Sequence, residues 1–405
     1  MVLNTVLSNT GDAAIFEAIA HTLQLNSADP IEFTALDSAA AQASQLYPQW
    51  KIIQQPTRST RGSRALRAAS SRLRTTAVRI ITRSAVARRA VFLLGARTDF
   101  VHALRQITEA DIVLSSGGTY LVDHYNFGHR VAEIAFAHAL KKRVFLWTQS
   151  LGPFATEQSR KLAEELVPLV DGVYFRDARS ERAWQSVGPL PALSDVCADV
   201  VFSLYDPLKK QARRSEDQPL VLFSVRDWNQ AVAGGDFSFE SYAAAMRAAA
   251  EGFIAKGWRC QAVSTCQGVD GYAIDDSETA RRIFGGLQME INSDFHSPQE
   301  LMAILRGADL VIATRMHMAI MSLITETPVI AIAYETKSTE LFHSIGAPAS
   351  VTAIEAVDDA WAAMVTGSDD PTATAARLDE KQLNALRANA SKPAEAVALV
   401  SGLRK

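Results

Sequence analysis

The chain has 405 residues, and at about 150 residues per domain this length predicts two domains. Hydrophobic residues make up 48% and charged residues 21%, a globular composition that excludes disorder along the whole chain. The net charge of −3 provides no overall field for nucleic acid, so we expect no nucleic-acid partner.

Cysteine usage and hydropathy indicate the compartment. Cys197, Cys260 and Cys266 form neither a disulfide framework nor a CxxC metal pattern, which favours a reducing cytoplasm. The N-terminus lacks the basic region and the long apolar core of a secretory signal. No apolar run approaches the roughly 18 residues that a membrane-spanning helix needs. We therefore expect a cytoplasmic protein of enzyme size.

The first elements along the chain are an apolar strand and a helix around Ile15, Ile19 and Leu23, followed by an unusually basic segment over residues 58–97. This segment has eleven arginines and no acid; they are Arg58, Arg61, Arg64, Arg67, Arg72, Arg74, Arg79, Arg83, Arg88, Arg89 and Arg97. Leu66, Leu73 and Ile80 recur among them, so part of the segment is predicted to be a basic amphipathic helix.

Short apolar runs then alternate with helical periodicity. Strands are predicted at residues 112–114, 144–147, 173–175, 221–225, 310–313 and 329–333. Helices are expected around Ile134 and His138, and after Ser297, where Ser-Pro-Gln-Glu has capping-box spacing. Strand–helix alternation with continuously apolar strands predicts parallel sheets of the α/β class. We expect domains at 1–205 (with the basic insertion 58–97) and 220–370, a linker at 206–219, and a C-terminal helical segment at 371–405.

Polar residues follow several predicted strands, where ligands bind in open α/β sheets. Three such places are the turn Asn9-Thr10-Gly11-Asp12, the loop Ser115-Ser116-Gly117-Gly118-Thr119-Tyr120, and the run Gln149-Ser150-Leu151-Gly152-Pro153-Phe154. Backbone N–H groups in a Ser/Gly loop can cradle a phosphate or carboxylate. Each of the three is equally typical of an ordinary turn or helix cap.

The junction Thr314-Arg315-Met316-His317 is the most specific. A guanidinium at a helix N-terminus suits a phosphate or carboxylate, and a histidine beside it is a candidate acid or base. Arg176 and Arg226 also end strands, where a buried arginine is costly unless it meets an anion or an acid. The three arginines either converge on a multiply charged anion or anchor separate salt bridges. No histidine or cysteine spacing indicates a metal site.

Six motifs in this order resemble the polysaccharide pyruvyl transferase family. They are Asn9-x-Gly11-Asp12, Ser116-Gly117-Gly118, Gln149-Ser150-x-Gly152-Pro153-Phe154, Arg176-Asp177, Arg315-Met316-His317 and Tyr334-Glu335-x-Lys337. The resemblance implies two Rossmann-like domains of GT-B type with the active site in the cleft between them. It also implies transfer of pyruvate from phosphoenolpyruvate to two hydroxyls of a sugar as a cyclic ketal. Ser116 stands where many members have a further glycine, and the basic segment is unusually long.

The implied reaction assigns roles to residues. Phosphoenolpyruvate carries about three negative charges, so arginines are expected to bind it; the expected donor-binding residues are Arg315, Arg176, Arg226, Gly117, Gly118 and Lys337. His317 is expected to transfer the proton, with Asp12 and Glu335 orienting or deprotonating acceptor hydroxyls. The residues expected to contact the acceptor are Asn9, Tyr120, Asp123, Gln149 and Tyr334. No metal and no cofactor besides the co-substrate are expected.

Three other interpretations remain open. A GT-B glycosyltransferase that uses a nucleotide sugar shares the architecture, and a basic protein that binds membrane surfaces without catalysis accounts for residues 58–97. A family member without activity has the same sequence features. The partners expected are phosphoenolpyruvate, a sugar acceptor that can be lipid-linked, and an anionic surface at the inner face of the membrane.

Overall fold

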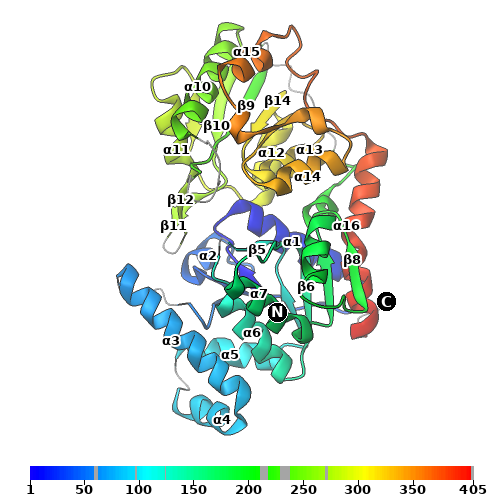
Figure 1. Cartoon of the computed structure of the whole chain (residues 1–405). Helices are drawn as coiled ribbons and strands as arrows, with labels where there is room; N and C mark the ends of the chain where they lie inside the picture. Colours follow the sequence, from blue (N-terminus) through cyan, green and yellow to red (C-terminus); the bar gives the residue numbers. More distant parts are fainter. Residues whose placement is uncertain are drawn as a thin grey trace. The chain divides into compact units, whose positions relative to one another are not determined.

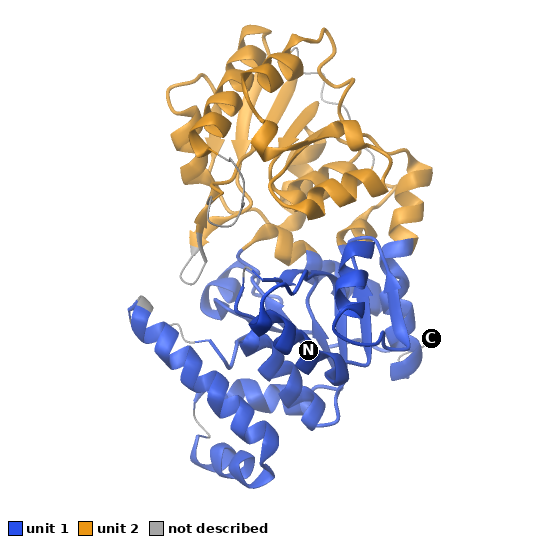
Figure 2. Ribbon diagram, viewed as in Figure 1, with its two compact units in different colours: residues 1–8, 15–200, 389–405 blue, residues 9–14, 201–388 orange. Residues whose placement is uncertain are grey.

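The computed structural model describes residues 1–58, 63–95, 98–123, 125–209, 218–228, 238–269 and 272–402. They form two compact α/β units, which Figure 2 shows in two colours. Unit 1 contains residues 1–8, 15–200 and 389–405, and unit 2 contains residues 9–14 and 201–388.

Unit 1 is built on a parallel sheet in the strand order β3-β2-β1-β4-β6-β7-β8, with β5 paired to β6 (Figure 1). The strands are β1 (Val2–Thr5), β2 (Thr34–Asp37), β3 (Lys51–Gln54), β4 (Ile112–Ser115), β5 (Gly118–Leu121), β6 (Arg143–Leu151), β7 (Gly172–Phe175) and β8 (Leu193–Val196). The helices are α1 (Thr10–Leu25), which begins in unit 2, α2 (Ala40–Leu46), α3 (Arg64–Arg83), α4 (Ala85–Leu94), α5 (Asp99–Glu109), α6 (Gly128–Ala139), α7 (Glu157–Leu166) and α8 (Ala178–Gln185). The central strands are apolar on both faces because helices cover both sides of such a sheet.

Unit 2 has a second parallel sheet, in the order β13-β10-β9-β14-β15-β16. Its strands are β9 (Leu220–Ser224), β10 (Arg259–Val263), β13 (Glu290–Asn292), β14 (Leu310–Ala313), β15 (Val329–Ala333) and β16 (Val351–Ala353), with the hairpin β11 (Gln267–Val269) and β12 (Tyr272–Asp275). The helices are α10 (Phe239–Ala255), α11 (Asp276–Phe284), α12 (Pro298–Arg306), α13 (Met316–Ile324), α14 (Thr336–Ser344), α15 (Asp359–Gly367) and the first part of α16 (Glu380–Ser401), up to residue 388.

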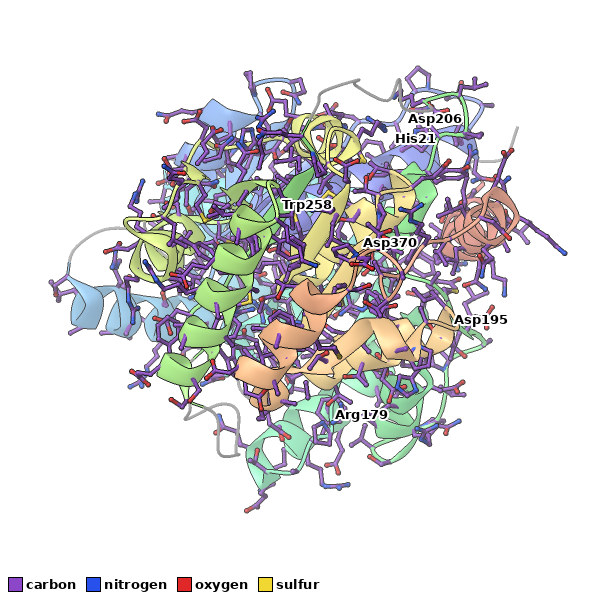
Figure 3. The ribbon with its side chains drawn as sticks, turned by 90° about the horizontal axis from the view of Figure 1, so that it is seen from above. His21, Arg179, Asp195, Asp206, Trp258 and Asp370 are labelled. Atoms are coloured by element: carbon purple, nitrogen blue, oxygen red, sulfur yellow. The ribbon has the colours of Figure 1, made fainter. Side chains whose placement is uncertain are left out.

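Aromatic packing holds the core of unit 2 together. The ring of Phe223 on β9 lies 5.3 Å from Phe284 and 6.3 Å from Phe253. Trp258, labelled in Figure 3, lies edge-on to Phe253 at 5.2 Å. Edge-to-face contacts at these distances add to the stabilisation from burial alone. This core supports the sheet from which the loops described below emerge.

All six predicted strands are present, as β4, β6, β7, β9, β14 and β15. The capping box is confirmed as well: the Ser297 hydroxyl accepts a hydrogen bond from Glu300 N, and the Glu300 carboxylate accepts one from Ser297 N. The apolar periodicity around Ile15 and Ile134 marks α1 and α6.

The units divide the chain at other places than expected. Residues 9–14 belong to unit 2, because Thr10 N donates to the Thr265 carbonyl at 3.1 Å and Asn9 forms an antiparallel bridge with Cys266. Residues 371–379 are not helical: Ala376 pairs with Val329 on β15. Residues 210–217 of the expected linker lie outside the described residues.

The C-terminal helix α16 ends in unit 1 rather than forming a segment of its own. Lys392 on α16 pairs with Asp195 on β8 at 2.9 Å, and Asp195 is labelled in Figure 3. The side-chain oxygen of Asn389 accepts a hydrogen bond from Ala198 N at 2.5 Å. The expected helical segment at 371–405 is helical from Glu380 to Ser401, and its second half belongs to unit 1.

The basic segment forms the two helices α3 and α4, where its amphipathic pattern predicted one helix over part of the segment. Ser63 caps α3, and Ser84 ends α3 and caps α4 through Ala87 N at 3.2 Å. Val78 and Ile81 are buried against the core of unit 1. Arg61 and Arg97 lie outside the described residues. Among the helices of the described residues, none has the length and hydropathy to cross a bilayer.

Candidate active site

In unit 2 the end of β14 places Thr314, Arg315 and His317 where the chain enters α13. All four strand residues before Thr314 are buried, and Arg315 is the extended N-cap residue of α13. The Thr314 hydroxyl forms a 2.8 Å hydrogen bond with the hydroxyl of Tyr242 on α10. Burial raises the pKa of Tyr242, so this phenol is neutral. The strand end is thus held firmly in place.

Arg315 is buried, with 6% of its surface exposed, and forms an ion pair with Asp276. Its Nε donates to the two carboxylate oxygens at 2.9 and 3.2 Å, and its Nη2 donates to the same carboxylate. Asp276 is the first residue of α11 and also accepts a hydrogen bond from Thr265 at 3.2 Å. The pair fixes the guanidinium at the start of α13.

Gly11 packs directly against His317. A Cβ atom at Gly11 would lie 2.5 Å from Nδ1 of His317 and 2.9 Å from its Cβ and Cγ, so only glycine fits there. The Asn9 side-chain oxygen accepts a hydrogen bond from Gly11 N at 2.9 Å and holds this turn. Asp12, 8% exposed, follows in the first turn of α1. The structure therefore brings the expected Asn9, Asp12 and His317 into one place.

Cys266 is buried and forms a β-bridge with Asn9 of this cluster. Burial raises the pKa of its thiol to about 12, and the charges of Arg315, Asp276, Asp12 and Arg226 act on the same pKa. The thiol is protonated at neutral pH, and only a thiolate is a good nucleophile. Cys266 is therefore a packing residue here and not a nucleophile.

Arg226 follows β9 and is 8% exposed. Its Nη1 donates to the hydroxyl of Tyr334, and its guanidinium carbon lies 4.3 Å from the centre of the Tyr334 ring and 4.8 Å from that of Trp228. No described acid forms an ion pair with it, and its Nε has no hydrogen-bond partner among the described residues. A buried cation without an acid partner is costly, so Arg226 is well suited to an anionic ligand.

Tyr334 also connects Arg226 to the loop after β15. Glu335 is the N-cap residue of α14 and pairs with Lys337 at 2.5 Å, each side chain being 16% exposed. The Lys337 ammonium lies 5.4 Å from the centre of the Tyr334 ring. The expected residues Arg226, Tyr334, Glu335 and Lys337 thus form one cluster of two cations, one acid and an aromatic ring.

In unit 1, Arg176 connects strands β5 and β6 to the segment after β8. Its Nη1 donates to Asp199 at 2.7 Å, its Nε to the Ser150 hydroxyl at 2.9 Å, and its Nη2 to the Thr119 hydroxyl at 3.1 Å. The side chain is 7% exposed. Asp177, next in the chain, caps α8 and accepts a hydrogen bond from the Ser150 hydroxyl at 2.9 Å. This geometry favours the salt-bridge anchor over direct ligand binding for Arg176.

The loop with Gly117 and Gly118 is closely packed. A Cβ atom at Gly117 would lie 2.9 Å from the Thr148 hydroxyl oxygen, and Gly118 has a φ of +128°, which other residues rarely adopt. Gln149 is fully buried, and its amide nitrogen donates to the Ser116 carbonyl. Its amide oxygen accepts no hydrogen bond from the described residues. Gln149 therefore holds the loop in shape.

Tyr120 and Asp123 lie further along the same segment. The Tyr120 carbonyl accepts a 2.7 Å hydrogen bond from Arg130, whose guanidinium lies 4.5 Å from the centre of the Tyr120 ring. One oxygen of Asp123 accepts a hydrogen bond from Ala155 N at 3.0 Å, and the other has no partner among the described residues. Their expected contact with the acceptor stays a prediction. Within the described parts of the chain, no three His, Cys, Asp or Glu side chains cluster as metal ligands.

Sequence reasoning missed Asp276, Asp199 and Trp228, which contact the arginines, and Tyr242, which contacts Thr314. Asp276 stands beside Asp275 before a helix, a pattern that by itself indicates only a cap. Trp228 and Tyr242 are typical core residues by type. No signal in the sequence distinguishes these four from residues with purely structural roles.

Sequence comparison matches a model of the family described as polysaccharide pyruvyl transferase to residues 9–336. The amylovoran biosynthesis protein AmsJ of Erwinia amylovora is 25% identical over 272 residues, or 63% of this chain. The match spans 64% of that relative, which is less than two thirds of its length.

Solved structures with a similar fold include two UDP-GlcNAc 2-epimerases. One, from Neisseria meningitidis bound to UDP-GlcNAc, has a TM-score of 0.57 at 10% identity over 99% of both chains. The other, from Methanocaldococcus jannaschii, has a TM-score of 0.55 at 10% identity over 98% of both chains. Anabaena HepE in complex with UDP-glucose has a TM-score of 0.51 at 12% identity, covering 99% of this chain and 94% of that one. These identities show the fold alone, and they confirm two α/β domains of GT-B type.

Proposed function

Because the chain belongs to the polysaccharide pyruvyl transferase family, we propose that it transfers the pyruvyl group of phosphoenolpyruvate to two hydroxyls of a sugar. The product is a cyclic ketal on a polysaccharide or its precursor. The observation that carries the proposal is the contact between Gly11 and His317 in the same unit that holds the buried cation Arg226. A group that transfers protons and a cation without an acid partner are what this reaction needs.

Arg226 is the primary ligand for the donor in this proposal. Its Nε has no hydrogen-bond partner among the described residues, and its guanidinium is desolvated between Tyr334 and Trp228, which strengthens its attraction for an anion. Lys337, whose ammonium lies 5.4 Å from the centre of the Tyr334 ring, adds a second positive charge near that ring. Arg315, which Asp276 orients, supplies a third cation at the start of α13.

His317 exchanges the proton on which the reaction depends. Protonation of the methylene carbon of phosphoenolpyruvate makes the neighbouring carbon electrophilic, and a first sugar hydroxyl forms a bond to that carbon. A second hydroxyl then displaces phosphate as the carbon–oxygen bond to phosphate breaks. The two sugar hydroxyls release two protons. One returns to His317, which gave its proton to the methylene carbon, and the other leaves with phosphate. Asp12 on α1, which follows the Gly11 that packs against His317, orients an acceptor hydroxyl.

The acceptor is proposed to be carried on a lipid, with the enzyme working at the cytoplasmic face of the membrane. Leu66, Leu73 and Ile80 on α3 are 64%, 73% and 55% exposed, and their spacing of seven residues places them on one face. An exposed apolar stripe on a helix rich in arginine is typical of an interfacial helix. This surface favours an acceptor that is held at a bilayer.

The test is incubation with labelled phosphoenolpyruvate and a panel of lipid-linked and nitrophenyl sugars, following phosphate release. We expect release that depends on a sugar, and an Arg226→Gln variant with a KM for phosphoenolpyruvate raised at least about tenfold. Arg259→Gln, at an exposed arginine on β10 of the same unit, is the matched control. Turnover of a UDP- or GDP-sugar without consumption of phosphoenolpyruvate would instead support the alternative that the protein is a glycosyltransferase.

A further inference from the structure

Unit 1 contains a pocket of about 920 Å³ between α3, α6 and α7, lined by residues that have no role in the reaction proposed above. In Figure 1, α3 (light blue) runs beside α6, and the two helices are in contact. The α3 wall carries Ser71, Arg72, Thr75 and Arg79. The first turn of α6 and the first turns of α7 complete the lining.

The lining is strongly basic. Arg58, Arg72, Arg79, Arg130 and Lys161 face the pocket, and Glu157 is the one acid among the lining residues. Glu157 is already paired with Lys161 at 2.6 Å, and Arg79 is paired with Glu165 at 2.9 Å. Arg58, Arg72 and Arg130 form no ion pair with any described acid. Three positive charges thus meet in one pocket without an ion-paired acid among the described residues.

Arg130 is a buried part of the pocket wall, which distinguishes this pocket from a cluster of surface side chains. It is 7% exposed, and its Nη1 is fixed by the Tyr120 carbonyl at 2.7 Å. Its Nε is buried without a hydrogen-bond partner among the described residues. The neighbouring His129 places Nδ1 3.1 Å from the Asn126 carbonyl, which leaves its buried Nε2 without a described partner. The buried Nε of Arg130 is therefore a donor available to a ligand, whereas Nε2 of His129, whose Nδ1–H faces the Asn126 carbonyl, is an acceptor and does not donate to an anion.

The acid nearest to these cations does not neutralise them. Glu133 is fully buried one turn further along α6, and one of its oxygens accepts hydrogen bonds from Thr57 O–H and N–H. Burial raises the pKa of Glu133 to about 7, so it is only partly ionised at neutral pH. A buried cation such as Arg130 is costly without a full counter-charge, and a bound anion would offset that cost.

We propose that this pocket binds a phosphate-bearing ligand, a phosphomonoester or diphosphate group. Guanidinium groups match phosphate oxygens through paired N–H donors, and the N-terminus of α6 adds the positive end of its dipole. The volume exceeds that of a single phosphate, which leaves room for the group that bears it. The exposed stripe of Leu66, Leu73 and Ile80 occupies the opposite face of α3, so the same phosphate chemistry can come from a soluble compound or from a lipid headgroup.

The first experiment is calorimetric titration of the full chain with inorganic phosphate and inorganic diphosphate. We expect saturable diphosphate binding that Arg58→Gln and Arg72→Gln each weaken at least about tenfold, as expected for the loss of a charge-assisted contact. Both side chains are exposed, so the variants should melt like the wild type. Arg83→Gln, at an exposed arginine of α3 that does not line the pocket, is the matched control and should bind like the wild type.

Three outcomes would overturn the proposal: no saturable binding of either anion, equal weakening by Arg83→Gln, or binding that survives both pocket variants and is lost in Arg226→Gln. The last outcome would place the anion in the proposed donor site and leave the pocket empty. A flotation assay with phosphatidylcholine vesicles containing phosphatidic acid identifies the source. If diphosphate releases the protein and Arg72→Gln weakens flotation, the ligand is a lipid headgroup; if diphosphate binds but does not compete, it is a soluble phosphate compound.

Discussion

Arg176, Arg226 and Arg315 each follow an apolar strand, yet the groups around the three guanidiniums differ. Arg176 and Arg315 have buried acid partners, Asp199 and Asp276, which stand 23 and 39 positions away in the chain. Arg226 has only aromatic neighbours and a phenol. The sequence predicted that these arginines would need partners. It could not show which partners, because the fold alone brings such distant residues together.

The buried pair of Arg315 and Asp276 makes a prediction about stability. Arg315→Gln leaves a carboxylate that is 1% exposed without its counter-charge, so we expect the free energy of unfolding to fall by about 3–5 kcal/mol. Adding Asp276→Asn should restore part of the loss, because the uncompensated charge is then gone. Urea denaturation of the two single variants and the double variant measures this. If the single variant is as stable as the wild type, the pair does not stabilise unit 2.

The contact between Gly11 and His317 makes a prediction about catalysis. In a Gly11→Ala variant the new methyl group overlaps the imidazole, so the ring must move. We expect kcat to fall by roughly a hundredfold, as for loss of one acid–base group, with little change in the KM for phosphoenolpyruvate. The matched control is Gly367→Ala, where an added Cβ meets no atom within 4 Å. An unchanged kcat for Gly11→Ala, or a kcat for His317→Gln near that of the wild type, would remove His317 from the proton transfer.

Glu133 makes a prediction about pH. Its pKa is raised from 4.5 to about 7 by burial, so between these values the folded protein binds more protons than the unfolded chain. Stability from this group is therefore fully present below about pH 4.5 and is lost as pH rises through 7. From pH 5 to pH 8 we expect the wild type to lose on the order of 1–3 kcal/mol more than Glu133→Gln in urea denaturation. Glu164→Gln, at an exposed residue of α7, should keep the wild-type slope, and parallel slopes for all three proteins would refute the prediction.

At the scale of elements, the strands that the sequence predicted are interior strands of the two sheets. β4, β6, β9 and β14 are buried on both faces, so each reads as a continuous apolar run. The four edge strands β3, β8, β13 and β16 were missed. Most of their residues are half-buried or exposed. With three or four residues each, these strands show neither a continuous apolar run nor an alternation of apolar and polar residues. The apolar interior strands were predictable for this reason, whereas the interior strands β2 and β10, the strand β5 and the four edge strands were missed.

The helix α3 carries the prediction that belongs to this scale. We expect the wild type to float with phosphatidylglycerol vesicles at low salt and to be released at high salt, because several arginines near an anionic bilayer each contribute about 1 kcal/mol. Replacing Leu66, Leu73 and Ile80 by Ser should abolish flotation, since these exposed side chains are the part that enters the interface. Leu25→Ser, at a leucine of α1 that is 52% exposed, is the control. Flotation of the triple variant like the wild type would show that the apolar stripe does not contact the lipid.

At the scale of the whole molecule, the two-domain α/β fold was predictable and the path of the chain between the units was not. The fold persists in the Neisseria and Methanocaldococcus structures at 10% identity, so it depends on the pattern of apolar strands and helices rather than on particular residues. The chain passes between the units several times, because residues 9–14 join unit 2 and residues 389–405 join unit 1. Single hydrogen bonds and ion pairs hold these crossing segments, and such contacts produce no periodic pattern in the sequence.

The end of α16 tests how much the return to unit 1 stabilises that unit. Ala390, Ala394 and Val397 are fully buried there, and Lys392 pairs with Asp195. Each buried apolar side chain contributes on the order of 1 kcal/mol, so a chain ending at residue 388 should lose several kcal/mol from unit 1. For a unit of about 200 residues this lowers the melting temperature by roughly 10 °C. Scanning calorimetry should show that transition shifted while a second transition, from unit 2, stays in place. A chain ending at Ser401 keeps these contacts and should melt like the full chain; if the longer deletion does so too, the end of α16 does not stabilise unit 1.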